Sequence, residues 1–361
     1  MSVARTIPVR LLVRQLALVG LALLATLPTL RPADAYPGAP WLVGGAVYTG
    51  NFPDPAVLLV DGTYYAYATN SGGAHIPVLT SHDLRTWTAP ASGSTDALPR
   101  TAAWGVDITV GEARMRETWA PGVLRYDGRY LMFYALRMRA GPRRTCISIA
   151  TARKPQGPFQ DTSTAPVVCD DDPLGSIDPQ PYVDPTTGAA YLTWKSEGHR
   201  GVTPTRLWAQ RLDGTGTGVA AGAPRAMLLE TALPWEGPII ENPSMLRYGD
   251  RWWLFYSANE WSSARYAVGY ATCAGPLGPC TRATSQPLLT STATRLGPGG
   301  AAAFVGTDGG LRLAYHYWNA PYTAYPPYPG CGATRTCVSR GQRRLAVLRL
   351  HRVGDERLAV G

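Results

Sequence analysis

Residues 119–135 read WAPGVLRYDGRYLMFYA, and this stretch decides the fold because the chain repeats its pattern. An apolar run follows a Pro, an Asp-Gly pair interrupts it, and a second run rich in aromatic residues comes after the pair. Asp-Gly tolerates the positive φ angles of a tight hairpin turn, and Tyr and Phe favour strands. The stretch therefore predicts two antiparallel strands joined by a short turn.

The same hairpin pattern occurs five times along the chain. The other copies are PDPAVLLVDGTYYAYAT (53–69), IDPQPYVDPTTGAAYLTW (177–194), ENPSMLRYGDRWWLFYS (241–257) and the fainter AAAFVGTDGGLRLAYHYW (301–318), which lacks the Pro. Third strands are expected at 76–81, 146–152, 207–212, 266–272 and 344–350. Five repeats of about 60 residues, each with three or four strands, predict an all-β fold, a five-bladed β-propeller. A two-domain β-sandwich is the alternative, but it does not predict one hairpin recurring around the whole chain.

The composition fits a large core rich in strands. Of the 361 residues, 45% are hydrophobic and 16% are charged, which excludes a disordered chain. The 11 Trp and 19 Tyr residues suit pleated strands and also stack on sugar rings. The Gly/Pro-rich segments 91–117 and 319–341 are too long for plain turns, and we expect them to shape a binding site.

The first 35 residues have the organisation of a secretory signal peptide. Arg5, Arg10 and Arg14 precede an apolar run over 15–30, and the small-residue site Ala33-Asp34-Ala35 follows. The run is short for a membrane span, which needs about 20 residues, and an uncleaved anchor is the alternative. We expect cleavage after residue 35, a secreted, extracellular protein without a membrane partner, and a single propeller domain over 36–361.

The net charge does not indicate a nucleic-acid partner. Removal of residues 1–35, which hold four Arg and one Asp, lowers the formal net charge from +9 to +6. The remaining basic residues are scattered among acids and turns, and no basic run carries interleaved aromatic residues. We therefore expect no nucleic-acid binding, and we expect a monomer.

Six cysteines lie beyond the signal segment, an even number that suits disulfides in an oxidising compartment. Their spacing allows local bridges for two pairs and leaves a third pair at hairpin separation: Cys273/Cys280, Cys331/Cys337 and Cys146/Cys169. Zinc ligation is the alternative, but no Cys pair is followed by His at the spacing of a zinc finger. Disulfides are therefore predicted.

Acidic residues recur beside the repeat prolines. Asp54, Asp178 and Glu241 stand at the start of three different hairpins. The first strand of each propeller blade lines the central channel, so these three carboxylates are predicted to meet in one cleft. Cleavage of a glycosidic bond requires two carboxyl groups of unequal pKa, one ionised as base and one protonated as acid. For either Asp alone, a turn element before Pro is the alternative.

From about Asn51 to Trp318 the chain resembles glycoside hydrolase family 43, five-bladed enzymes that remove arabinofuranose or xylose from plant polysaccharides. NFPDPAVLL resembles the family's catalytic-base motif and implies Asp54 as the general base that activates water. SIDPQPYVD resembles the motif of the auxiliary Asp and implies that Asp178 raises the pKa of the acid. The resemblance also implies inversion of the anomeric centre, with no cofactor required for the chemistry.

Two glutamates compete for the role of the acid, which the family writes as Glu, a small residue and Pro. Glu236 has the common spelling EGP, whereas Glu241 of ENPSM lies 13 residues before Leu254, the distance that this motif usually shows. We also place Glu241 in register with Asp54 and Asp178 in the internal repeat. On spacing and register we predict Glu241 as the acid, although Asn in place of Gly or Ala departs from the family pattern.

Further site residues follow from the same resemblance. Trp119 of WAPG is expected to face the channel and stack on a sugar ring, with core packing as the alternative. Asn259 and Trp261 of SANEW are further candidates for substrate binding. His316 of YHYW is expected near the channel axis, where water links it to a structural calcium or another cation, and a buried His satisfied by its neighbours is the alternative.

The choice of substrate rests on loops rather than on the scaffold. ENPSM, SANEW and CAGPLGPC look most like family members that act on α-1,5-linked arabinofuranose, often from chain ends. We therefore expect an exo-acting α-L-arabinofuranosidase whose partner is a plant cell-wall polysaccharide or oligosaccharide. A β-xylosidase, an endo-arabinanase and a non-catalytic carbohydrate-binding propeller are the alternatives. A sialidase is disfavoured because the chain has no repeated Asp-box, and a fructosidase because Pro-Asp-Pro replaces Asn-Asp-Pro.

Overall fold

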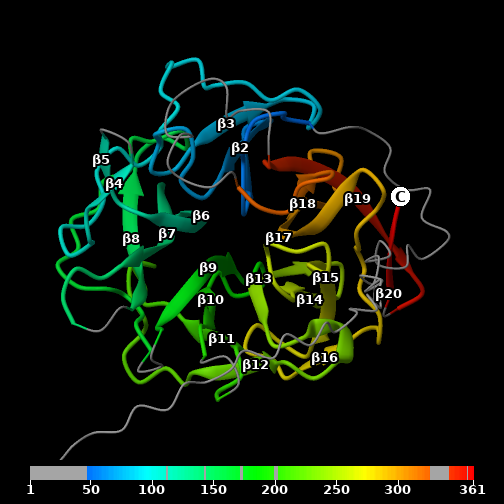
Figure 1. Ribbon diagram of the computed structural model, residues 1–361. Coiled ribbons are helices and arrows are strands. Elements are labelled where there is room, and N and C mark those ends of the chain that lie inside the picture. The colour runs from blue at the N-terminus through cyan, green and yellow to red at the C-terminus, as the bar shows by residue number, and fades with distance from the viewer. Residues whose placement is uncertain are drawn as a thin grey trace, which may run out of the picture. The chain divides into compact units, whose positions relative to one another are not determined.

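Each hairpin repeat forms its own antiparallel sheet, and the five sheets are arranged around an axis as the blades of a β-propeller (Figure 1). The computed structural model describes residues 47–110, 113–141, 144–170, 174–198, 202–325, 341–355 and 357–361. The predicted all-β, five-bladed fold is therefore confirmed. The proposed signal peptide lies outside the described residues.

The strands follow one another outward from the axis in chain order. Blades 1 and 2 contain β1 (Ala56–Val60), β2 (Thr63–Tyr67), β3 (Val78–Ser81), β6 (Thr118–Tyr126), β7 (Arg129–Arg137) and β8 (Thr145–Ala152). Blade 3 contains β9 (Ser176–Val183), β10 (Ala190–Ser196), β11 (Arg206–Arg211) and β12 (Ala226–Glu230). Blade 4 contains β13 (Ile240–Tyr248), β14 (Arg251–Ala258), β15 (Ala267–Cys273) and β16 (Cys280–Arg282). Blade 5 contains β17 (Arg295–Val305), β18 (Leu311–Asn319), β19 (Arg343–Val353) and β20 (Arg357–Val360).

The Asp-Gly turns behave as the sequence predicts. Asp61 and Gly62 between β1 and β2 have φ angles of 47° and 78°, and Asp127 and Gly128 between β6 and β7 have 49° and 72°. Both pairs thus occupy the left-handed region that a two-residue hairpin loop requires. Two short elements were not predicted, the hairpin of β4 (Ile108–Val110) and β5 (Ala113–Met115) within 91–117, and the 3₁₀ turn η1 (Pro234–Glu236).

Hydrophobic residues fill the gaps between neighbouring blades. In β7, Met132 and Tyr134 pack toward blade 1, whereas Leu131 and Phe133 pack toward blade 3. Successive residues of a strand point to opposite faces, so one apolar strand serves two interfaces. Comparable clusters join blades 3 and 4, blades 4 and 5, and blades 5 and 1 in the described part of the chain. This packing explains why the second strand of each hairpin is rich in apolar and aromatic residues.

The two ends of the described chain meet blade 5. The backbone N–H of Val47 donates to the carbonyl of Leu345 at 3.1 Å, and that of Phe52 donates to the carbonyl of Arg343 at 2.7 Å. The tail after Leu350 continues β19 and returns as β20, a fourth strand on the same sheet. The described segment that precedes blade 1 therefore closes the ring against blade 5.

Two of the predicted disulfides are present, Cys146–Cys169 and Cys273–Cys280. The Cys331/Cys337 pair lies outside the described residues. Within the ranges that the structure describes, no helix has the length and apolar character needed to cross a membrane.

Candidate active site

The innermost strand of every blade carries the same irregularity near the axis. Five equivalent residues have left-handed φ angles between 42° and 57°: Asp54, Ala120, Asp178, Asn242 and Gly300. In blades 2 to 5 the pairing register slips here, so that two residues of the inner strand face one of its neighbour. This is a β-bulge, which redirects side chains, and strained backbone of this kind clusters at functional sites.

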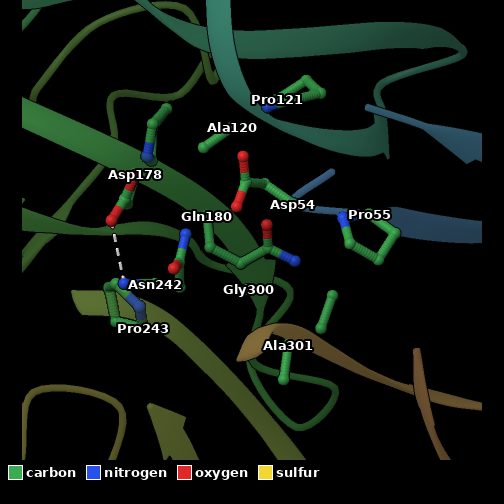
Figure 2. A pocket seen from close by; sticks show the side chains of 12 residues that line it. Asp54, Pro55, Ala120, Pro121, Asp178, Gln180, Asn242, Pro243, Gly300 and Ala301 are labelled. Atoms are coloured by element: carbon green, nitrogen blue, oxygen red, sulfur yellow. Dashed lines mark hydrogen bonds between the residues drawn. The ribbon is translucent and has the colours of Figure 1, made fainter. Parts of the chain in front are cut away.

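The bulges line a pocket on the axis to which all five blades contribute (Figure 2). Its wall consists of residues 54–55, 120–121, 178–180, 242–243 and 300–302. Figure 2 shows the carboxyl groups of Asp54 and Asp178 reaching this pocket from different blades, with the backbone N–H of Asn242 bonded to Asp178. Two of the three predicted acidic residues thus line one hollow.

Asp54 is held as an anion. Arg343 Nη1 lies 3.1 Å and 3.2 Å from its two carboxylate oxygens, and the hydroxyl of Thr69 donates to Oδ2 at 2.6 Å. Burial by itself raises the pKa of Asp54, but the Arg343 charge and the Thr69 hydrogen bond outweigh it, so the pKa is lowered. Asp54 is therefore ionised at neutral pH, as a general base must be.

Asp178 shows the opposite behaviour. It is 7% exposed, and the backbone N–H of Asn242 donates to its Oδ2 at 2.9 Å. Burial and then the negative charge of Glu241 raise the pKa of Asp178 well above its usual value, although Lys195 acts in the other direction. Asp54 and Asp178 thus have pKa values displaced in opposite directions within one pocket.

Glu241 lies one residue before the bulge. The residue equivalent to Asp54 and Asp178 is Asn242, so the predicted register of Glu241 is wrong by one position. Glu241 is 8% exposed and does not itself line the pocket. Its Oε2 accepts a bond of 2.9 Å from Lys195 Nζ, and its Oε1 lies 2.7 Å from the hydroxyl of Tyr266. The offset arises because the bulge falls on the residue directly before Pro. In blade 4 that residue is Asn242, and Glu241 stands one step earlier.

Glu236 is a structural anion. It is fully buried in η1, and Arg282 Nε and Nη2 donate to its two oxygens at 2.6 Å and 2.8 Å. The backbone N–H groups of Ala232 and Leu233 and the hydroxyl of Tyr256 also donate to it. Burial raises the pKa of Glu236, but the bonds from Arg282 and the backbone outweigh this and lower it. A carboxylate so fully bonded has no proton to give.

The predicted substrate-binding residues fall in different places. Trp119 in β6 is half-buried, and the Arg137 guanidinium lies 5.8 Å from its ring. Asn259 uses its side-chain amide to donate to the carbonyl of Trp235, so it holds the loop after β14. Neither residue lines the axial pocket.

Trp261 is connected to the pocket through Arg343. Its ring is 36% exposed and stacks on Trp318, with centroids 5.9 Å apart. The Arg343 guanidinium, which binds Asp54, lies 4.8 Å from the Trp261 ring. Trp261 therefore forms an aromatic surface next to the cation that holds Asp54.

His316 is buried at the same end of the ring. Its Nδ1 accepts the backbone N–H of Asp54 at 3.0 Å, and its ring stacks on Tyr266. Burial and the nearby charge of Arg343 lower the pKa of His316 to about 3, so the ring is neutral. Because Nδ1 accepts, the proton lies on Nε2, which is buried without a protein partner. A protonated Nε2 suits a water molecule rather than a direct bond to a cation.

Two charged residues of this site were missed by sequence reasoning. Arg343 precedes a predicted strand and carried no signal of its own. Lys195 carried a faint one, since the chain has only two lysines and this one stands inside a hairpin strand. Among the described residues, no group of three or more His, Cys, Asp or Glu is placed to hold a metal ion.

The comparisons with known proteins agree with this architecture. The model of the glycosyl hydrolases family 43 matches residues 45–339. The probable arabinan endo-1,5-alpha-L-arabinosidase A of Aspergillus flavus is 24% identical over 287 residues, which cover 74% of this chain and 82% of that protein.

Two solved structures share the fold. A thermostable family-43 glycoside hydrolase superimposes with a TM-score of 0.69 at 24% identity, covering 88% of this chain and 94% of the other. The endo-arabinase of Bacteroides thetaiotaomicron superimposes with a TM-score of 0.64 at 21% identity, covering 87% and 99%. Since the family model spans most of the sequence, the chain belongs to the glycosyl hydrolases family 43.

Proposed function

We propose that this protein is an inverting glycosidase that removes α-L-arabinofuranose from the ends of arabinan or of arabinose-decorated plant polysaccharides. The observation that carries the proposal is the opposite displacement of two pKa values in one pocket, with Asp54 lowered and Asp178 raised. The lowered pKa suits Asp54 as the base, and the raised pKa of Asp178 reflects its burial beside the charge of Glu241, the proposed acid. The name of the fungal relative supports arabinan as the substrate class.

In this mechanism Asp54 takes a proton from a water molecule that attacks the anomeric carbon. Glu241 gives a proton to the glycosidic oxygen as the bond from that oxygen to the anomeric carbon breaks. The products are a sugar with a new anomeric hydroxyl and an alcohol, and the configuration is inverted. The reaction requires carboxyl groups about 6.5–9.5 Å apart, so that water fits between Asp54 and the sugar.

The surrounding residues have supporting roles. Arg343 and Thr69 keep the Asp54 carboxylate ionised and oriented toward the attacking water. Asp178 is proposed as the auxiliary residue beside the acid: burial and the negative charge of Glu241 raise its pKa, and its Oδ2 accepts the backbone N–H of Asn242, the residue after Glu241. Trp119 and Trp261 are proposed to contact sugar rings. Asn259 contributes indirectly by holding its loop.

We also propose that a hydrated cation such as calcium binds near His316. The residues fit such an ion only through water, because the buried Nε2 carries the proton. Bound there, the ion would supply positive charge on the axis and no covalent chemistry. His316 would then donate its Nε2–H to a water of the hydration shell.

Secretion is part of the proposal. The two disulfides suit an oxidising compartment, where a plant polysaccharide is also encountered. An N-terminal signal over residues 1–35 remains our prediction for the route of export.

The decisive experiment is product analysis on linear α-1,5-arabino-oligosaccharides by chromatography, with NMR of the anomer formed first. Release of arabinose alone, with inverted configuration, supports the proposal. A mixture of oligomers indicates an endo-arabinanase instead. Xylose released from xylo-oligosaccharides indicates a β-xylosidase. Binding without release indicates a carbohydrate-binding propeller.

A further inference from the structure

One position of the second strand pairs with the residue just before the bulge, and in blades 1 to 5 it holds Thr69, Ala135, Lys195, Ser257 and His316. In blades 1, 4 and 5 its side chain accepts a backbone N–H from the bulge of the next blade. The pairs are Thr69 with Ala120 at 2.8 Å, Ser257 with Gly300 at 2.9 Å, and His316 with Asp54 at 3.0 Å. In these three blades the position therefore ties the blade to its successor.

Blade 2 has Ala135 here, which offers no acceptor, and blade 3 has a charged residue. The equivalent residue is Lys195, which pairs with Ile177 before the bulge of β9. An ammonium group has no acceptor, so the N–H of Asn242 bonds to Asp178 instead. Lys195 Nζ binds Glu241 Oε2 at 2.9 Å and Glu197 Oε2 at 2.7 Å. Its side chain is 3% exposed, whereas that of Glu197 is 23% exposed.

The charges around Glu241 come from several elements. Lys195 faces it from β10, and Asp178 from β9. The hydroxyl of Tyr266, just before β15, donates to Glu241. Asp54 acts with its charge on Asp178 across the pocket. The Lys195 ammonium at 2.9 Å holds the Glu241 carboxyl group in place and brings a full positive charge next to the proposed acid.

Glu197 balances this charge because it binds the Lys195 ammonium from the other side at 2.7 Å. We infer that Lys195 is a positioning residue that fixes the carboxyl group of Glu241, and that Glu197 is the counter-charge that balances Lys195 beside the proposed acid. The inference rests on the proposed function. Lys195 thereby gives up the inter-blade hydrogen bond that this position makes in blades 1, 4 and 5 in favour of orienting the acid.

The test compares Lys195→Met, Lys195→Arg and Glu197→Gln with the wild type and with the matched control Lys154→Met, which changes the other, exposed lysine. Each is assayed on arabino-oligosaccharides and on an aryl arabinofuranoside with a good leaving group. We expect Lys195→Met to lower kcat on the oligosaccharide about 100-fold, the usual scale of general acid catalysis, with KM little changed. The loss of kcat on the aryl substrate should be much smaller. Lys195→Arg should recover part of the oligosaccharide activity that Lys195→Met loses.

Glu197→Gln supplies a readout that does not depend on the fold of the Lys195 variants. Removal of the counter-charge should move the alkaline limb of the kcat profile about one pH unit lower. If the wild type is active but the pH profile of Glu197→Gln and the leaving-group dependence of Lys195→Met are both unchanged, the inference is overturned while the proposed function stands. Absence of sugar release from the wild type overturns the proposed function and the inference with it.

Discussion

The backbone N–H of Asp54 donates a 3.0 Å hydrogen bond to Nδ1 of His316, although 262 residues separate the two along the chain. This bond joins blade 1 to blade 5, so one contact both closes the ring and fixes the proposed base. Gly300 packs directly against the pair, since a Cβ there would lie 2.5 Å from Nδ1 and 2.7 Å from Asp54 Oδ1. The geometry of the base therefore depends on the closure of the propeller.

The closure can be tested with His316→Leu, which keeps similar volume and removes the acceptor. The buried N–H of Asp54 then loses its partner, which costs about 1–3 kcal/mol of unfolding free energy, and kcat falls because Asp54 is displaced. Urea unfolding and kinetics on arabino-oligosaccharides measure the two effects. The exposed His351→Leu is the control and should change neither. Wild-type stability in His316→Leu would show that the bond does not hold the ring.

Arg343→Met tests what keeps Asp54 ionised. With Arg343 present the pKa of Asp54 lies below its usual 3.8, so a base that must be ionised loses activity only below that pH. Without the Arg343 charge, burial dominates and raises the pKa, so the acidic limb of kcat/KM should move to higher pH. Profiles between pH 3 and 8, with the exposed Arg349→Met as control, check this. An unmoved limb would contradict the role given to Arg343.

Glu241→Gln and Glu236→Gln should fail in different ways. Glu241→Gln should fold normally and lose at least about 100-fold in kcat on substrates with poor leaving groups. Glu236→Gln leaves Arg282 without its buried partner, which should cost about 3 kcal/mol of unfolding free energy while folded molecules keep most of their activity. Kinetics per folded molecule and thermal unfolding separate the cases. Loss of catalysis confined to Glu236→Gln would reverse the assignment of the acid.

The Glu236–Arg282 pair also predicts a pH dependence of stability. The folded-state pKa of Glu236 is lower than its usual 4.5, so its contribution is fully present above about pH 4.5. It is lost as the pH falls through the folded-state pKa, because protonation breaks the pair. The difference in unfolding free energy between wild type and Glu236→Gln should therefore be largest near pH 6 and shrink below pH 4. A constant difference would argue against an ionised Glu236.

Trp261→Ala tests the aromatic surface beside Arg343. Loss of a stacking contact with a sugar ring is worth about 1 kcal/mol, so KM should rise several-fold with a smaller change in kcat. Trp119→Ala gives the matched comparison for blade 2. Unchanged KM in both variants would remove these residues from the binding site.

The sequence by itself determined the elements whose causes are local. Asp-Gly turns and apolar runs define each hairpin within a few residues, and their recurrence predicts the number of blades. The positions of Asp54 and Asp178 were also readable, because the bulge falls at the same step before Pro in the four repeats that contain the Pro. The disulfides Cys146–Cys169 and Cys273–Cys280 were predicted from spacing alone.

Only the tertiary structure decided how the carboxylates differ. Glu236 and Glu241 look alike in the sequence, yet Glu236 is bonded to Arg282 and Glu241 to Lys195. In each of these pairs the two residues are 46 positions apart along the chain. Arg343 reaches Asp54 across 289 residues. Charge, burial and hydrogen bonds act through space over a few ångströms, so the partners that shift a pKa are known only once the ring has closed.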